Sequence, residues 1–307
     1  MIATQIALLR RELWEHRSIY VTPLVVALII SVMSITGQVA VSAFDQIVDM
    51  AILGATNLGV AERRSAITVL MVSVSVLFVL AMWILTVFYT LDSLFAERKD
   101  KSILFWRSIP VTDAETVISK LTTAVVVIPL ITFVVLASTQ VLVLIISSIW
   151  VSIRGADAGH LIWQAAPILE TWAATLITLL ALPLWLSPFI GWFLLVSAYT
   201  KRSPLLVAFL PIILLPMFEK ILVGTKMFST AIFVRTGNMP LFRGVDTLGI
   251  WDDDSEQLYE LGRSGVSLLS IVDLIGFLTN PGLWLGLVVC GLFTTAAIYV
   301  RRFRDES

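Results

Sequence analysis

The sequence predicts an all-α integral membrane protein with six transmembrane helices. Hydrophobic residues make up 58% of the 307 residues and charged residues only 14%, whereas an average soluble domain carries about 25% charged residues. The mean hydropathy is correspondingly high, at +0.94. Residues 67–91 and 121–153 contain no charged side chain, and each run exceeds the about 20 residues that a helix needs to cross a bilayer.

Residues 1–18 predict an amphipathic helix that lies in the membrane interface. The apolar residues recur there at helical spacing, namely Ile2, Ile6, Leu9 and Leu13. The arginines of the segment lie on the other faces of the helix. Trp14 suits the headgroup depth that tryptophan prefers. The segment lacks the apolar core and small-residue cleavage site of a secretory signal peptide. The alternative is an ordinary cytoplasmic extension of the first spanning helix.

Residues 19–307 are predicted to form the transmembrane domain. Its six spans are expected at about 19–37, 67–91, 121–150, 171–200, 203–220 and 283–300. The third and fourth apolar runs exceed the ~30 Å of the hydrocarbon core, so they should tilt, protrude or break. Pro129, Pro183 and Pro188 are the expected places for kinks, because proline removes a helical hydrogen bond.

The distribution of basic residues predicts the orientation of the chain. Thirteen of the Lys and Arg residues fall in the N-terminal segment, the 92–120 loop, the 201–202 turn and the C-terminal tail, and eight fall on the other side. Short loops rich in Lys and Arg face the cytoplasm. Both termini and the 92–120 loop are therefore expected to face the cytoplasm, in a bacterial cytoplasmic (inner) membrane.

The 221–282 loop is predicted to lie on the opposite, outward side. It contains an acidic run, Asp252, Asp253, Asp254 and Glu256. Oxygen-rich loops can bind calcium, but this spacing does not match an EF-hand, so a solvated acidic loop is the preferred interpretation. Residues 266–278 predict an interfacial or re-entrant helix, and Asp273 favours the interface because a charge at the bilayer centre is unfavourable.

Several classes of function lack the residues they need. There is no glycine-rich phosphate loop, no HExxH zinc motif and no serine–histidine pair placed for hydrolysis, so no catalytic or metal site is predicted. No basic stripe suggests a nucleic-acid surface. Cys290 lies inside an apolar run and is expected to be a buried small hydrophobe. No charged residue falls near the middle of a span, which argues against ion-coupled transport.

The most distinctive stretch is 97–113, with the sequence ERKDKSILFWRSIPVTD. Asp100 or Ser102 could cap a short helix that Pro110 ends. An apolar anchor for the groove of a soluble partner would be formed by Ile103, Leu104, Phe105 and Trp106. The surrounding polar rim would comprise Glu97, Arg98, Lys99, Asp100, Lys101 and Arg107. The alternative is an interface loop with Trp106 as a lipid anchor.

The end of this loop carries its own helix-start signal. Thr112 and Asp113 are predicted to cap the helix that leads into the third span, with Glu115 or Thr116 in its first turn.

The run from Leu91 to Leu121 resembles the first cytoplasmic loop of ABC type-2 permeases. The ending FLTNPGLWLGLVVCGLFTTAAIYVRRFRDES and the amphipathic leader are similar to other parts of that family. The resemblance implies a permease subunit that exports or extrudes a hydrophobic or amphipathic substrate. It also implies two copies of a separate ABC ATPase subunit, which bind the ATP and Mg, while this chain binds no cofactor.

The same resemblance implies that the permease pairs with a second copy of itself or with a paralogous permease. ATP-driven closure would then change the packing of the first, second and fifth spans at the interface between copies. A possible substrate path would be lined by Phe78, Trp83, Phe88 and Phe209. The alternative function is a non-ABC channel or assembly scaffold that docks another soluble partner through residues 97–113.

Overall fold

The computed structural model describes residues 2–36, 60–100, 111–242 and 267–303. Within these ranges the chain is helical apart from short connections and one isolated β-bridge between Phe242 and Val272. Six helices are long and apolar enough to cross a membrane. The prediction of an all-helical chain with six such helices is therefore confirmed for the described residues.

The leader forms a helix of its own. Helix α1 covers Ile2–Glu15 and α2 covers Ser18–Ile35, so the leader is not a continuation of the first span. The face of α1 that packs on the protein includes Leu8 and Leu13, so it only partly overlaps the predicted apolar stripe. Leu8 is buried, whereas Ile6 is 60% exposed and Trp14 is 71% exposed. The exposed side of α1 is the one available to a membrane interface.

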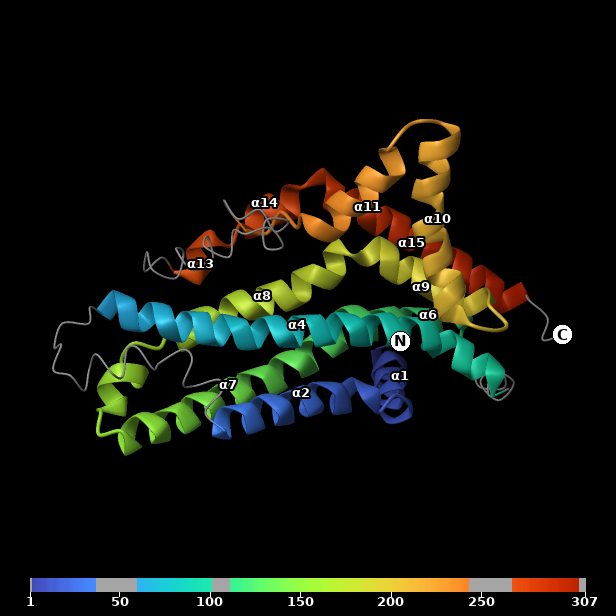
Figure 1. Cartoon of the computed structure of the whole chain (residues 1–307). Coiled ribbons are helices and arrows are strands. Elements are labelled where there is room, and N and C mark those ends of the chain that lie inside the picture. Colours follow the sequence, from blue (N-terminus) through green and yellow to red (C-terminus); the bar gives the residue numbers. More distant parts are fainter. Residues whose placement is uncertain (1, 37–59, 101–110, 243–266, 304–307) are drawn as a thin grey trace.

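Helix α4, Val60–Lys99, is the longest element and the centre of the fold. At 1.5 Å per residue its 40 residues extend for about 60 Å, roughly twice the thickness of a hydrocarbon core. Figure 1 shows α4 running between α2 and α7 on one side and α8, α9 and α15 on the other. The span predicted at 67–91 is thus only the middle part of this helix. The helix continues into the start of residues 97–113, which we call the charged loop.

The third apolar run is one long helical segment with an irregular turn. Helix α6, Asp113–Thr122, passes through a π-helical turn, Thr123–Val127, into α7, Ile128–Ile153. Pro129 lies at the start of α7. Because proline has no N–H to donate, the wider turn before it accommodates the missing hydrogen bond.

The fourth apolar run is broken, as its length and prolines predicted. Helix α8 covers Ile168–Trp185 and α9 covers Ser187–Tyr199, with Leu186 between them. Pro188 occupies the first turn of α9, where a missing N–H is tolerated. A short π-helical segment, Gly159–Trp163, precedes α8.

Helix α10, Pro204–Leu222, is the least buried of the six candidate spans. Only 6% of its apolar window is buried, and Ala208 is its one buried residue. Figure 1 shows α10 crossing the direction of the other long helices rather than lying along them. Apart from Ala208 and the partly buried Val207, Phe209 and Ile212, which pack on α4 and α9, most of its side-chain surface is exposed.

The 266–278 stretch forms two short helices instead of the single one that was expected. Helix α13 covers Leu268–Ile271 and α14 covers Leu274–Thr279, after α11, Met227–Gly237. The carboxylate of Asp273 caps α14 by accepting a hydrogen bond from the Gly276 N–H at 3.0 Å. Asp273 is thus the N-cap of α14, whereas α13 ends at Ile271 with Val272 as its C-cap. The last span, α15, follows at Pro281–Phe303.

The buried side-chain amide of Gln140 connects three long helices, α4, α7 and α8. The amide of Gln140 on α7 donates to the Met71 carbonyl on α4 at 2.8 Å, and its oxygen accepts from the Trp172 indole on α8 at 2.9 Å. Because unsatisfied polar groups are unfavourable inside a membrane, these bonds favour one register of the three helices.

Helices α9 and α15 approach closely at Gly191 and Cys290. Cys290 is 5% exposed, which confirms that it is a buried residue. A Cβ atom at position 191 would lie 2.9 Å from the Cys290 carbonyl oxygen and 3.0 Å from its Cα. A backbone contact of this kind requires glycine, because rigid helix backbones cannot move aside for a methyl group.

We expect Gly191→Ala to destabilise the protein by about 1–3 kcal/mol, the usual penalty for overpacking. Gly291→Ala is the matched control, because a Cβ there meets no atom within 4 Å. It should be neutral or slightly stabilising, since alanine favours a helix over glycine. Thermal unfolding of the two purified variants in detergent checks this. Equal melting temperatures would contradict the close-packing argument.

Candidate functional site

The predicted docking residues divide into a described part and a part outside the described residues. Glu97 and Arg98 belong to the last turn of α4, and Asp100 follows it as an exposed residue. The remaining predicted docking residues, which include the whole apolar anchor, lie outside the described residues: Lys101, Ile103, Leu104, Phe105, Trp106 and Arg107.

Glu97 does not belong to an exposed rim, because its side chain is only 5% exposed. Three cations from three other elements surround it. Lys120 Nζ lies 3.0 Å from Oε1 and Arg301 Nη1 lies 2.6 Å from Oε2. Arg11 Nη2 lies 3.0 Å from Oε1. The carboxylate therefore joins α1, α6 and α15 to the end of α4.

Two further carboxylates extend this cluster. Glu12 of α1 is completely buried; its Oε1 lies 2.9 Å from Lys120 Nζ, and its Oε2 accepts a 2.8 Å hydrogen bond from the Tyr89 hydroxyl. Asp113, the first residue of α6, lies 2.9 Å from Arg301 Nε. We call the set the ionic network; it comprises Arg11, Glu12, Glu97, Asp113, Lys120 and Arg301.

The ionic network contains three carboxylates and three cations. Charges removed from water are strongly unfavourable unless partners with good geometry compensate for them. Here every member has an opposite charge within 3.0 Å. Any relative shift of the four helices would leave a buried charge unpaired, so the ionic network favours one arrangement of these helix ends.

The start of α6 explains how Asp113 reaches its place. The Thr112 hydroxyl accepts a hydrogen bond from the Glu115 N–H, and the Glu115 carboxylate accepts one from the Thr112 N–H. This capping box confirms the helix start predicted from sequence. It sets Asp113 in the first turn, where it faces Arg301, and Lys120 two turns later on α6.

Arg98 makes a second connection between the charged loop and the bundle. Its Nη2 donates to the carbonyl oxygens of Ser197 at 2.5 Å and of Thr200 at 2.7 Å, at the C-terminal end of α9. A cation there also interacts favourably with the helix dipole. Arg98 is thus partly buried, whereas Lys99 and Asp100 of the predicted rim remain exposed.

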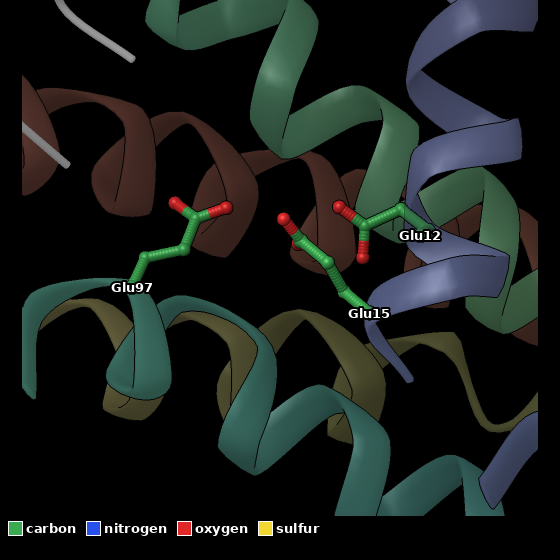
Figure 2. A group of neighbouring side chains, drawn as sticks. All are labelled: Glu12, Glu15 and Glu97. Carbon is green, nitrogen blue, oxygen red and sulfur yellow. The ribbon is translucent and has the colours of Figure 1, made fainter. Parts of the chain in front are cut away.

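Three neighbouring carboxylates raise the possibility of a metal site. Figure 2 shows Glu97 on α4 facing Glu12 and Glu15 on α1, and their oxygen atoms lie within 4.8 Å of one another. Glu15 is paired with Arg11 at 2.7 Å, and Lys120 contacts both of the other carboxylates. A divalent cation would have to displace these basic groups, so the arrangement fits an ion-pair cluster better than a metal centre.

The residues predicted to line a substrate path do not share one surface. Phe78 is completely buried in the core, and Phe88 is 55% exposed. Trp83 and Phe209 are partly buried and pack around the same apolar cluster, formed by residues of α4, α9 and α10. The side chain of Phe78 therefore lies in the interior of the chain, and its place in a substrate path stays a prediction.

Sequence reasoning missed five of the six network residues, because only Glu97 was among the predicted site residues and Arg11 was regarded as part of a polar helix face. Glu12, Asp113, Lys120 and Arg301 lie near helix ends, where single charges are normally solvated or obey the topology rule. A signal was present in the leader: Glu12 lies four residues after Leu8, on the same helical face. Because Leu8 is buried and Glu12 is completely buried, that face is the one that packs on the protein.

Comparisons of this chain with protein-family models, with curated proteins and with solved structures find no match. The class of the protein therefore rests on its own structure. Six helices of sufficient length and apolar character indicate a multi-pass membrane protein, with the ionic network at the end of the bundle that carries the charged loop.

We expect Glu97→Gln to destabilise the protein by about 3 kcal/mol, because it leaves buried cations without their shared partner. Glu15→Gln removes a 39% exposed carboxylate from the same neighbourhood, and exposed pairs are worth about 0–1 kcal/mol. Unfolding of both variants in lipid nanodiscs provides the measurement. A Glu97→Gln protein as stable as Glu15→Gln would show that the ionic network is not a stabilising constraint.

His16 should make the stability of the leader depend on pH. Burial lowers the pKa of His16 below its ordinary value of 6.5, although Glu12 at 3.7 Å acts in the opposite direction. The unfolded chain therefore binds a proton more readily than the folded chain, so stability rises with pH through this window and falls on acidification. His16→Gln should flatten the pH dependence of the melting temperature below pH about 6.5. Identical pH profiles for the two proteins would contradict this.

Proposed function

We propose that this chain is the membrane-spanning permease subunit of an ATP-driven ABC exporter. The observation that carries the proposal is the position of Arg301. Its guanidinium contacts Glu97, just before residues 101–110, and Asp113, just after them, at 2.6 Å and 2.9 Å. One side chain of the last span thus holds both ends of the loop that resembles the ABC docking loop.

This geometry supports the transmission of force from a soluble partner. A push on residues 101–110 acts first on the last turn of α4 and on the start of α6. Because Arg301 and Lys120 connect these ends through buried ion pairs, the two helices and α15 would move together. Packed elements with such links change between discrete arrangements rather than deforming gradually.

The leader belongs to the same mechanical unit. Arg11 and Glu12 connect α1 to Glu97 and Lys120. A helix in the interface plane would therefore rise or tilt with the charged loop when an ATPase dimer closes. In this proposal the ATPase subunits supply ATP, Mg and hydrolysis, and this chain supplies the membrane path and no catalytic group.

The arrangement of the ends is compatible with a cytoplasmic partner. The start of the chain, the α4–α6 junction and the end of α15 lie at one end of the bundle, as Figure 1 shows. This is the end that the positive-inside rule assigns to the cytoplasm. We place the protein in a bacterial cytoplasmic membrane with both termini inside.

The exposed surface of α10 supports pairing with a second permease. Its large apolar residues, Leu206, Ile213 and Met217, are between 57% and 65% exposed, and the helix is the least buried candidate span. In a bilayer such a surface faces lipid or another protein. A half-transporter needs a second copy, or a paralogous permease, to enclose a path for a hydrophobic or amphipathic substrate.

The docking claim can be tested by co-purification with candidate ABC ATPase subunits and by ATP-dependent transport in vesicles. Phe105→Ala with Trp106→Ala should reduce ATP-dependent transport at least about tenfold, since buried aromatic anchors contribute several kcal/mol at an interface. Tyr299→Ala with Phe303→Ala is the matched control, because it removes two exposed aromatic residues at the same end of the bundle. Full coupling in the first double variant would refute docking through this loop.

A second variant separates docking from transmission. Arg301→Lys keeps the charge but cannot contact Glu97 and Asp113 through two nitrogens of one planar group. We expect the ATPase to co-purify as before while transport per ATP hydrolysed falls. Loss of ATPase binding and transport together would place Arg301 in docking instead. If the chain inserts normally but co-purifies with a soluble partner other than an ABC ATPase, the result would favour the alternative function, a channel or an assembly scaffold.

A further inference from the structure

An open cavity of about 770 Å³ lies beside the start of α15, whereas the ionic network contacts the end of that helix through Arg301. Helix α11 forms one wall, and the end of α8 and the start of α15 form the rest. Its volume is within the range of about 300–1,000 Å³ that is usual for small-ligand sites. No described residue that lines it is acidic, whereas Lys226 and Arg235 are both basic.

Arg235 is the unusual member of this lining. Its guanidinium lies over the Trp185 ring, with Cζ 4.0 Å from the ring centroid, and Nη1 donates to the Gly282 carbonyl at 2.6 Å. Nε and Nη2 are buried and have no hydrogen-bond partner among the described residues. Within the part of the chain that the structure describes, no carboxylate is paired with this cation.

The desolvation of Arg235 and a second positive charge at the cavity both favour an anion there. Burial lowers the pKa of Arg235, which is the response of a cation without a compensating carboxylate. The guanidinium also occupies the space where a side chain at Gly286 would begin, so α15 provides room for it. Lys226, at the start of α11, is exposed and adds a second positive charge at the same cavity.

The apolar part of the cavity indicates the kind of anion. Trp185, Met227 and Val234 line it next to the two basic residues. Helix α11 has no buried residue, and its Met227 and Phe233 are 77% and 61% exposed. A helix with such a surface suits the interface between headgroups and acyl chains. A lipid phosphate could then reach the basic residues while its chains stay along α11.

We propose that this cavity binds the phosphate headgroup of an anionic lipid between Lys226 and Arg235. Arg235 lines the cavity as a planar cation and Lys226 as a mobile point charge, a combination suited to a phosphate. The site is independent of the ATPase docking proposed above, since it shares no residue with the charged loop or the ionic network. It stands whether or not the chain is an exporter.

Native mass spectrometry of the full-length protein in detergent tests the site. Phosphatidylglycerol, phosphatidylcholine and glycerol 3-phosphate are added separately to delipidated protein. We expect phosphatidylglycerol to bind about tenfold more tightly than phosphatidylcholine, the effect of one favourable charge contact. Glycerol 3-phosphate should bind weakly because it lacks acyl chains. Equal binding of both lipids, or tight binding of glycerol 3-phosphate, would overturn the lipid assignment.

The variants localise binding to the cavity. Lys226→Gln and Arg235→Gln should each weaken phosphatidylglycerol binding about tenfold. Lys220→Gln is the matched control, because Lys220 is an exposed lysine nearby on α10 that does not line the cavity. An equal loss with Lys220→Gln would mean that lipid binding is a general effect of surface charge and would contradict the site.

A third variant moves the guanidinium without removing its charge. Gly286→Ala places a methyl group where Arg235 lies and should displace it, while Gly291→Ala on the same helix meets no atom. We expect the first to weaken phosphatidylglycerol binding and the second to leave it unchanged. A different result would overturn the proposal. If phosphatidylglycerol bound only after Asp252, Asp253 and Asp254 had been neutralised by substitution, a carboxylate of the chain would be the counter-charge of Arg235.

Discussion

The arrangement of the helix ends depends on the buried carboxylate of Glu97. It lies at the end of the longest helix and accepts contacts from Lys120, Arg301 and Arg11, which come from three separate elements. In a membrane bundle the hydrophobic effect does not distinguish one apolar helix neighbour from another, because lipid is equally apolar. Directional contacts must supply that choice. At this end of the protein the ionic network determines which helices are neighbours. The hydrogen bonds of Gln140 have the same effect on α4, α7 and α8, with fewer contacts.

The same constraint relates the fold to its proposed action. The ionic network is at the boundary between the membrane bundle and the charged loop, and Arg301 holds both sides of that loop. A rigid junction would transmit a displacement from a docked partner to the leader and to the last span with little loss. The start of α15 has a different character. There the cavity beside Arg235 is lined by cations and apolar side chains, which suits lipid recognition rather than force transmission.

The sequence and the structure agree best where a single segment contains all the information. The helix start at Thr112 and Asp113 was predicted because capping residues act on backbone groups within a few residues, and the structure shows a capping box there. The break near Pro188 followed from the geometry of proline, and the six apolar runs followed from hydropathy. The leader was predicted as an amphipathic interfacial helix, and the structure shows a separate helix with one face packed on the protein. Amphipathicity identifies an apolar side, and both a membrane and a protein core can bind it.

Composition and periodicity alone determined that this chain is an all-helical membrane protein with a charged loop between its second and third spans, because hydropathy and helix signals act over neighbouring residues. Only the tertiary structure decided that Glu97 is buried and that residues as distant as Glu12, Lys120 and Arg301 surround it. It likewise decided that Arg235 lies on Trp185 over Gly286. The reason is physical: each of these charges looks like an ordinary helix-end charge in the sequence. Only the packing of separate helices removes it from water and determines its partner.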